Sequence, residues 1–176
     1  LKLAPVAGKL EVRVKGPTVM PGYLGSDAAN AAAFDEEGFY RLGDAVRLID
    51  GADPMQGLAF DGRISEDFKL SSGTWVSVGT LRTALVAAAD PLILDAVITG
   101  QDKPFVGALV WVAGDPVADS GFVDRLKAQL ADFNRKQGGS SRRIARIVIE
   151  TEPPSVAGGE MTEKGYINQR AVLARR

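Results

Sequence analysis

The sequence contains no cysteine and no histidine. Without cysteine, the chain has no disulfide, no thiolate metal site and no cysteine nucleophile. Without histidine, a Ser-His-Asp triad, a histidine base and a histidine metal ligand are excluded as well. Any catalytic group that this chain contributes is therefore a lysine, an arginine, a carboxylate, a tyrosine or a backbone dipole. A carboxylate site for Mg²⁺ or Ca²⁺ stays open, although no EF-hand spacing is present and we predict no metal ligands.

Long hydrophobic runs and an excess of one charge are also missing. No segment reaches the roughly 18 apolar residues of a membrane-spanning helix. The net charge of −1 gives no electrostatic reason to expect nucleic acid or an anionic membrane as a partner. The chain starts at Leu1 without an initiator Met or a signal-peptide pattern. We therefore expect a cytoplasmic protein of ordinary globular composition, present here as a fragment or a trimmed chain.

The first third of the chain has the patterns of β-structure. Residues 9–15 alternate strictly between polar and apolar side chains, as a half-buried strand does. Gly43-Asp44 has turn chemistry and is predicted to separate two strands. Ser26 is a suitable N-cap for a short alanine-rich helix. We expect strands at residues 9–15, 40–42, 45–49 and 58–60, and a helix at 26–33.

The remainder alternates between β- and α-patterns. Thr80 and Ser120 are candidate N-caps, and the second helix is expected to bury a stripe formed by Val123, Leu126, Leu130 and Phe133. We expect strands at residues 68–70, 74–76, 94–99, 105–112 and 144–149, and a terminal helix at 168–176. The predicted fold class is α+β. The end of a β-rich subdomain, residues 1–65, precedes a small C-terminal domain, residues 66–176, with a mixed sheet flanked by helices.

Residues 38–44, Gly-Phe-Tyr-Arg-Leu-Gly-Asp, form the first of three motifs. They resemble the "Y-R-T-G-D" element of the adenylate-forming enzymes, in which the Asp holds the ribose hydroxyls of ATP. The resemblance implies that Asp44 binds ribose. A fixed carboxylate suits this function because it accepts charge-assisted hydrogen bonds from two adjacent hydroxyls. The alternative interpretation is a β-turn with a solvated Asp.

Residues 62–73 form the second motif, which resembles the family's "G-R-x-x-D-x-I-K-x-x-G" hinge and hairpin. The resemblance implies that Arg63 contacts the nucleotide ribose and that a nearby acid is the hinge. This sequence is one residue longer before the final Gly. Counting from Arg63 makes Glu66 the hinge, whereas counting back from Gly73 makes it Asp67. We favour Glu66; the alternative interpretation is an ordinary charged loop before a strand.

Residues 161–170, Met-Thr-Glu-Lys-Gly-Tyr-Ile-Asn-Gln-Arg, form the third motif. The family usually ends with "T-x-S-G-K-I-x-R", whose Lys bridges the substrate carboxylate and the α-phosphate. Tyr166 stands where that Lys belongs, Gln169 stands where the Arg belongs, and Lys164 lies two residues earlier. In an extended segment, residues two apart face the same side, so Lys164 is our catalytic candidate. The alternative interpretation is that Lys164 is a solvated surface lysine. The form of this motif is similar to that of the feruloyl-CoA synthetases.

The resemblance runs from about residue 10 to residue 173 and implies an AMP-forming acid–thiol ligase. The substrates and cofactors would be a carboxylic acid such as ferulate, ATP with Mg²⁺, and CoA. The phosphate loop and acyl pocket of the family belong to a large N-terminal domain, so we expect that domain as partner and no activity from this chain alone. Alternatives are a carrier-protein-loading adenylation domain, another acyl-CoA ligase branch, or a non-catalytic α+β interaction module.

Two further features have a structural and a functional interpretation. Arg142, Arg143 and Arg146 form a basic cluster that suits a CoA phosphate, but a solvated strand edge is favoured. Trp75 suits the thiol channel of a ligase, but a core position is favoured.

Overall fold

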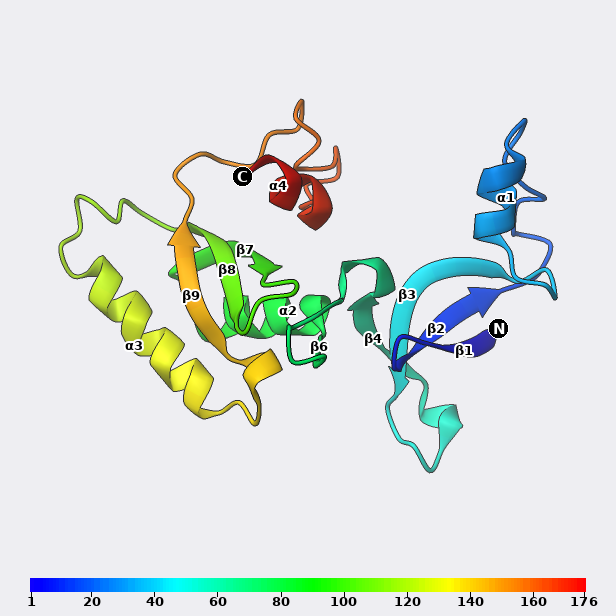
Figure 1. Cartoon of the computed structure of the whole chain (residues 1–176), viewed down its shortest axis with the longest axis horizontal. Helices are drawn as coiled ribbons and strands as arrows, with labels where there is room; N and C mark the ends of the chain where they lie inside the picture. Colours follow the sequence, from blue (N-terminus) through cyan, green and yellow to red (C-terminus); the bar gives the residue numbers. More distant parts are fainter. The chain divides into compact units, whose positions relative to one another are not determined.

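The computed structural model describes all 176 residues and divides them into two compact units, Leu1–Ser65 and Glu66–Arg176. Each unit has its own β-sheet, and no sheet includes strands from both (Figure 1). No helix of the chain is both long enough and apolar enough to cross a membrane.

The first unit is a four-stranded antiparallel sheet in the order β1-β2-β3-β4. Its first strand, β1, was not predicted. Ala7 and Gly8 both have left-handed backbone conformations, with φ of 52° and 83°, which suits a two-residue hairpin turn. The strands are β1 (Lys2–Val6), β2 (Lys9–Val14), β3 (Tyr40–Leu48) and β4 (Leu58–Arg63).

Two helical segments interrupt the strands of the first unit. Helix α1 (Asp27–Ala33) follows β2, and Ser26 caps it as predicted, since its side chain accepts a hydrogen bond from the amide of Ala29. A short 3₁₀ turn, η1 (Pro54–Gln56), lies between β3 and β4 and is capped by Asp53.

The prediction of a turn at Gly43-Asp44 was wrong, because β3 continues through both residues. Gly43 has a φ of +71°, and the register with β4 shifts between Asp44 and Val46. A glycine with left-handed φ beside a register shift is typical of a β-bulge. Arg41 and Ala45, on either side of these two residues, both pair with β2, and Asp44 pairs with Arg63 of β4, so the chain stays within one strand where its local composition favours a turn.

The second unit contains a short hairpin and a three-stranded mixed sheet. The hairpin consists of β5 (Phe68–Lys69) and β6 (Trp75–Val76), and a 3₁₀ turn, η2 (Ile64–Glu66), precedes it. In the sheet, β7 (Ile93–Thr99) is antiparallel to β8 (Val106–Val112), which is parallel to β9 (Ile144–Ile149). The parallel connection runs through α3 (Phe122–Arg135) and η3 (Ser140–Arg142), and this confirms the predicted α+β class with a mixed sheet.

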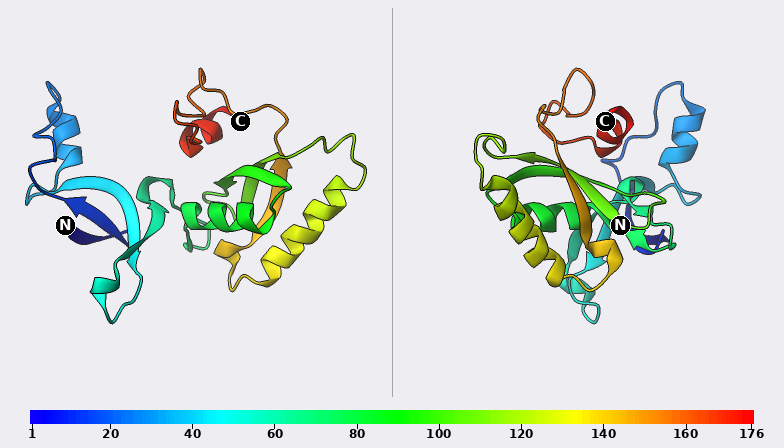
Figure 2. Two further views of the ribbon diagram at one scale, coloured as in Figure 1. Left: turned by 180° about the vertical axis from the view of Figure 1, so that it is seen from behind. Right: turned by 60° about the vertical axis from the view of Figure 1, so that its left-hand side comes forward.

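The two faces of this sheet carry different buried clusters. Ala96, Ile98 and Val110 belong to the larger cluster, to which α2 (Val78–Ala88) and α3 contribute. Val97 and Trp111 belong to a smaller cluster with Ile167 and Val172. Val172 lies on α4 (Gln169–Arg175), which is on the opposite side of the sheet from α2 (Figures 1 and 2). Alternation along the strands thus gives both faces an apolar covering.

Both helix starts differ from the sequence prediction. Helix α2 begins at Val78, so that Ser77 rather than Thr80 is its N-cap, and its first amide donates to Asp67 Oδ1 at 2.9 Å. Helix α3 begins at Phe122, because Asp119 forms a turn in which its carboxylate accepts from the amide of Gly121.

The later start changes the buried stripe of α3. Phe122, Leu126 and Phe133 are buried and Leu130 is partly buried, whereas Val123, predicted to face inward, is 39% exposed. We expect Phe122→Ala to lower the free energy of unfolding by about 3–5 kcal/mol, because a buried phenyl ring is lost and a cavity remains. Val123→Ala is expected to cost about 0.5 kcal/mol or less. Denaturant unfolding of the full chain measures both, and equal effects would contradict this assignment of the helix face.

Candidate functional site

Asp44 and Arg63, the two predicted ribose ligands, lie opposite each other on β3 and β4. Arg63 Nε is 2.9 Å from Asp44 Oδ1, and Arg63 Nη1 donates a hydrogen bond of 3.1 Å to the carbonyl of Leu42. Strand register therefore brings together two residues that come from separate sequence motifs.

The Asp44–Arg63 pair remains accessible to a ligand. The side chains are 29% and 55% exposed, respectively. Asp44 Oδ1 is itself buried and accepts no aligned hydrogen bond, so its contact with Arg63 is electrostatic, and only the rest of the carboxylate is open to a ligand. A carboxylate beside a guanidinium offers acceptors and donors at one place, which is the chemistry that recognises adjacent hydroxyls of a sugar.

The two hinge candidates have different surroundings. Asp67 accepts from the first amide of α2, so its side chain is tied to the second unit. Glu66 ends η2 and is the first residue of that unit. A change of backbone angles at Glu66 leaves the cap of α2 in place, whereas a change at Asp67 disturbs it. This difference favours Glu66, and its role as a hinge stays a prediction.

Lys164 lies at the tip of a tight turn rather than in an extended segment. The amide of Gly165 donates to the carbonyl of Thr162 at 2.9 Å, which closes a β-turn with Glu163 and Lys164 at its centre. The side chain of Lys164 is exposed and forms no ion pair. The argument that Lys164 and Tyr166 share one face of an extended strand is therefore wrong, because Lys164 lies within the turn and Tyr166 follows it on the returning arm.

Tyr166 and Gln169, which replace the family's usual Lys and Arg, are held in different ways. The carbonyl of Tyr166 accepts from the amide of Thr162 at 2.8 Å, and its ring side chain is exposed. Gln169 is buried and its Oε1 accepts from the amide of Ile98 at 3.2 Å. Gln169 therefore fastens α4 to β7, a structural contact that no motif predicted.

Trp75 and the basic cluster, the two further features of the sequence, both lie in the second unit. Trp75 is 41% exposed, with the ammonium of Lys69 5.0 Å from its ring, so the favoured prediction of a core position was wrong. Arg146 lies over the ring of Phe105 at 4.6 Å, and Arg143 donates twice to the carbonyl of Gln137. Both arginines thus have contacts within the unit, in keeping with the favoured structural interpretation.

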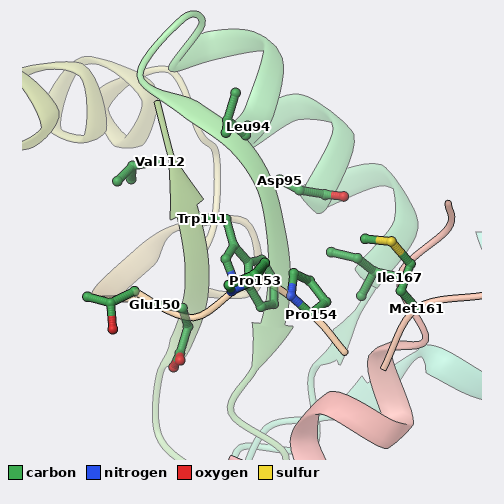
Figure 3. A pocket seen from close by; sticks show the side chains of 10 residues that line it. Leu94, Asp95, Trp111, Val112, Glu150, Pro153, Pro154, Met161 and Ile167 are labelled. Carbon is green, nitrogen blue, oxygen red and sulfur yellow. The ribbon is translucent and has the colours of Figure 1, made fainter. Parts of the chain in front are cut away.

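A pocket of about 320 Å³ lies between the sheet and the segment that precedes α4 (Figure 3). Its walls are mainly apolar, and the two acids that line it are paired: Asp95 with Arg82, and Glu150 with Arg176. The lining residues are Leu94, Asp95, Trp111, Val112, Glu150, Thr151, Pro153, Pro154, Met161 and Ile167. The chain has no group of three or more acidic side chains placed to hold a metal ion.

Comparisons with known proteins agree with this architecture. The family described as "AMP-binding enzyme C-terminal domain" matches residues 68–175. Carboxylic acid reductase of Segniliparus rugosus is 29% identical over 171 residues, 94% of this chain and 14% of that protein. Salicyl-AMP ligase / salicyl-S-ArCP synthetase of Mycobacterium tuberculosis is 31% identical over 167 residues, 92% of this chain and 27% of that protein.

A solved structure shows the same fold. The adenylation domain of the carboxylate reductase of Mycobacterium chelonae superposes with a TM-score of 0.77 at 22% identity, over 95% of this chain and 26% of that one. The chain thus spans about a seventh of the reductase of S. rugosus and about a quarter of the structurally similar adenylation domain.

Proposed function

The chain belongs to the family of AMP-binding enzyme C-terminal domains, and from this premise we propose that it is part of a longer ATP-dependent ligase. That enzyme activates a carboxylic acid as its acyl-AMP and then transfers the acyl group to a thiol. The observation that carries the proposal is the Asp44–Arg63 pair, in which two separately predicted nucleotide ligands meet at 2.9 Å.

In the first half-reaction, negative charge develops on the α-phosphate, and Lys164 is the cation of this chain that we propose to stabilise it. A carboxylate oxygen of the acid attacks the α-phosphorus of ATP, and the bond to pyrophosphate breaks. Asp44 and Arg63 hold the ribose, which fixes the nucleotide relative to the acid. The ammonium of Lys164 stabilises the charge that develops on the α-phosphate. Mg²⁺ enters with ATP, and the residues of this chain supply no cluster for it.

In the second half-reaction, a different surface of the C-terminal unit has to face the acyl-AMP. The thiol sulfur attacks the acyl carbon, and AMP leaves with the bonding electrons. Rotation about Glu66 would withdraw Lys164, which serves only the first step, and bring the β5–β6 hairpin with Trp75 towards the thiol. The exposure of Lys164 and Trp75 supports this proposal, since both side chains are available for contact outside their own unit.

CoA is the acceptor that we propose, with an aromatic acid such as ferulate as the substrate. The choice of CoA and the choice of ferulate both rest on the form of residues 161–170, Met-Thr-Glu-Lys-Gly-Tyr-Ile-Asn-Gln-Arg. A carrier-protein thiol is the second candidate, because one relative is named as a salicyl-S-ArCP synthetase. Another relative, FadD15 of Mycobacterium tuberculosis, is named as a CoA ligase at 32% identity over 136 residues, 77% of this chain and 20% of that protein.

The proposal predicts acid-dependent exchange of pyrophosphate into ATP by the longer protein that carries this chain. Ferulate should support exchange, and CoA should then convert the adenylate to a thioester; the isolated chain should do neither. The assay compares CoA with a pantetheine-loaded carrier protein at equal concentration. Transfer to the carrier protein alone would favour the second candidate. No exchange with any acid of a broad aromatic and aliphatic panel would leave a non-catalytic interaction module.

A further inference from the structure

The residues around Lys164 form a small hairpin with a well-defined base. The amide of Asn168 donates to the carbonyl of Glu160 at 2.8 Å, and Met161 pairs with Ile167 in an antiparallel bridge. Lys164 lies at the tip, four residues from Glu160 along the chain. The position of the tip therefore follows from what holds the base.

Glu160 is the buried anchor of this base, although nothing in the sequence singles it out. Its side chain is fully buried and accepts three hydrogen bonds: 2.8 Å from Arg176 Nε, 3.0 Å from Arg176 Nη2 and 2.8 Å from the amide of Ser155. The hydrogen bonds from Arg176, followed by the one from Ser155, lower the pKa of Glu160 to about 2. The carboxylate is thus charged at neutral pH and has a partner on both oxygens.

Arg176 joins Glu160 to the end of β9. Beyond its two bonds to Glu160, Nη1 donates to Glu150 Oε2 at 2.7 Å and to the carbonyl of Glu152 at 3.1 Å, while Nη2 donates to the carbonyl of Pro153 at 3.2 Å. These five contacts match the five N–H donors of a guanidinium. The guanidinium also lies 5.5 Å from the ring centre of Trp111. A lysine at this position has three donors and no planar fork, so it cannot reproduce the arrangement.

The return arm of the hairpin is fixed as firmly as the outgoing one. Ile167 is buried with Val97, Trp111 and Val172, on the face of the sheet that α4 covers. Asn168 caps α4 by accepting from the amide of Ala171 at 3.2 Å. Both arms are therefore held at the base by buried side chains and hydrogen bonds.

We propose that Glu160 and Arg176 are positioning residues, whose ion pair fixes the hairpin base and so directs the ammonium of Lys164 at the α-phosphate. This inference rests on the function proposed above, and it assigns no contact with substrate to either residue. A misplacement of about 1 Å in a positioned group costs on the order of 100-fold in rate. Loosening the base is therefore expected to slow acyl-AMP formation without affecting transfer to the thiol.

The test uses Glu160→Gln and the milder Arg176→Lys in the full-length enzyme. We expect each to lower kcat of acid-dependent pyrophosphate exchange roughly 10- to 100-fold, with an unchanged KM for ATP and an unchanged rate of thioester formation from preformed acyl-AMP. Arg82→Gln is the matched control, because it removes the two-bond pair between Arg82 and Asp95 in the same unit. Its exchange rate should stay within about twofold of that of the wild type.

A second measurement holds even if Glu160→Gln does not fold. In Arg176→Lys, the amides of Gly165 and Tyr166, which donate within the hairpin, should exchange with solvent faster than in the wild type. The amide of Ile144, which donates to Asn134 Oδ1 at the start of β9, should be unaffected. Unchanged exchange at both hairpin amides would overturn the inference.

Other outcomes separate this inference from the proposed function. An equal loss in both half-reactions, or a loss matched by Arg82→Gln, would make the ion pair a purely structural contact and overturn the inference. The inference would also be overturned if Lys164→Ala had a normal exchange rate while Glu160→Gln lost exchange. Absence of exchange in the wild type with every acid would instead overturn the proposed function.

Discussion

Replacing Lys164 by alanine is expected to slow acyl-AMP formation by about 100-fold or more while thioester formation from preformed acyl-AMP continues. The expectation follows from where charge develops in the two steps. Negative charge builds on the α-phosphate only during the first, and a positioned cation stabilises it there. Pyrophosphate–ATP exchange with ferulate measures the first step, and conversion of synthetic feruloyl-AMP with CoA measures the second.

Tyr166→Phe is the matched comparison, because Tyr166 occupies the position of the family's usual lysine. Its hydroxyl has no partner within the chain and its side chain is 69% exposed, so its loss should not affect folding. We expect Tyr166→Phe to retain exchange. If Lys164→Ala retains exchange, Lys164 is a surface lysine. If Tyr166→Phe then loses exchange, the tyrosine has the role proposed for Lys164.

Periodicity predicted most elements of the fold because the burial of one or both faces of an element leaves a regular apolar repeat in its sequence. Residues 9–15 alternate in sequence and form β2, and the apolar run 105–112 forms β8 between two clusters. Local turn chemistry was less reliable. Gly43-Asp44 has the composition of a turn, yet the flanking residues pair with β2 and Asp44 pairs with β4, which keeps both residues within β3. Propensity gave way to tertiary pairing at that point.

The predictions of where α2 and α3 begin were wrong for a related reason. Thr80 and Ser120 are good capping residues by type, but the caps depend on residues that precede them. Asp67 meets the first amide of α2 from eleven positions away, and Asp119 ends the turn before α3. A contact across a loop is not visible in a local pattern, so the predicted N-cap of α2 was three residues late and that of α3 was one residue early.

The candidate site was predicted in its residues and not in its geometry. The motifs singled out Asp44, Arg63 and Lys164, but only strand register explains why the first two meet. The hairpin around Lys164 depends on hydrogen bonds of Thr162 and on its base, which an extended segment would not form. Glu160 and its partner Arg176 are 16 residues apart, and neither belongs to a pattern that indicates a buried ion pair.

Asp44→Ala is expected to raise the KM for ATP roughly 10- to 100-fold, because a charged hydrogen-bonding partner of the ribose is lost. The effect should depend on the sugar. The wild type should use 2′,3′-dideoxy-ATP poorly, and Asp44→Ala should lose most of its preference for ATP over that analogue. Asp50→Asn is the matched control: it removes one carboxylate charge from an exposed turn of the same unit, where Asp50 accepts from the amide of Ala52.

The analogue separates recognition from general electrostatics. If Asp44 only balances the charge of Arg63, its removal frees a guanidinium near the nucleotide and the preference for ATP over the dideoxy analogue persists. If Asp44 accepts hydrogen bonds from the ribose, the preference falls because the hydroxyls no longer have an acceptor. A preference that persists in Asp44→Ala would mean that the ion pair between β3 and β4 joins the strands and does not read the sugar. The nucleotide would then have to be recognised elsewhere in the enzyme.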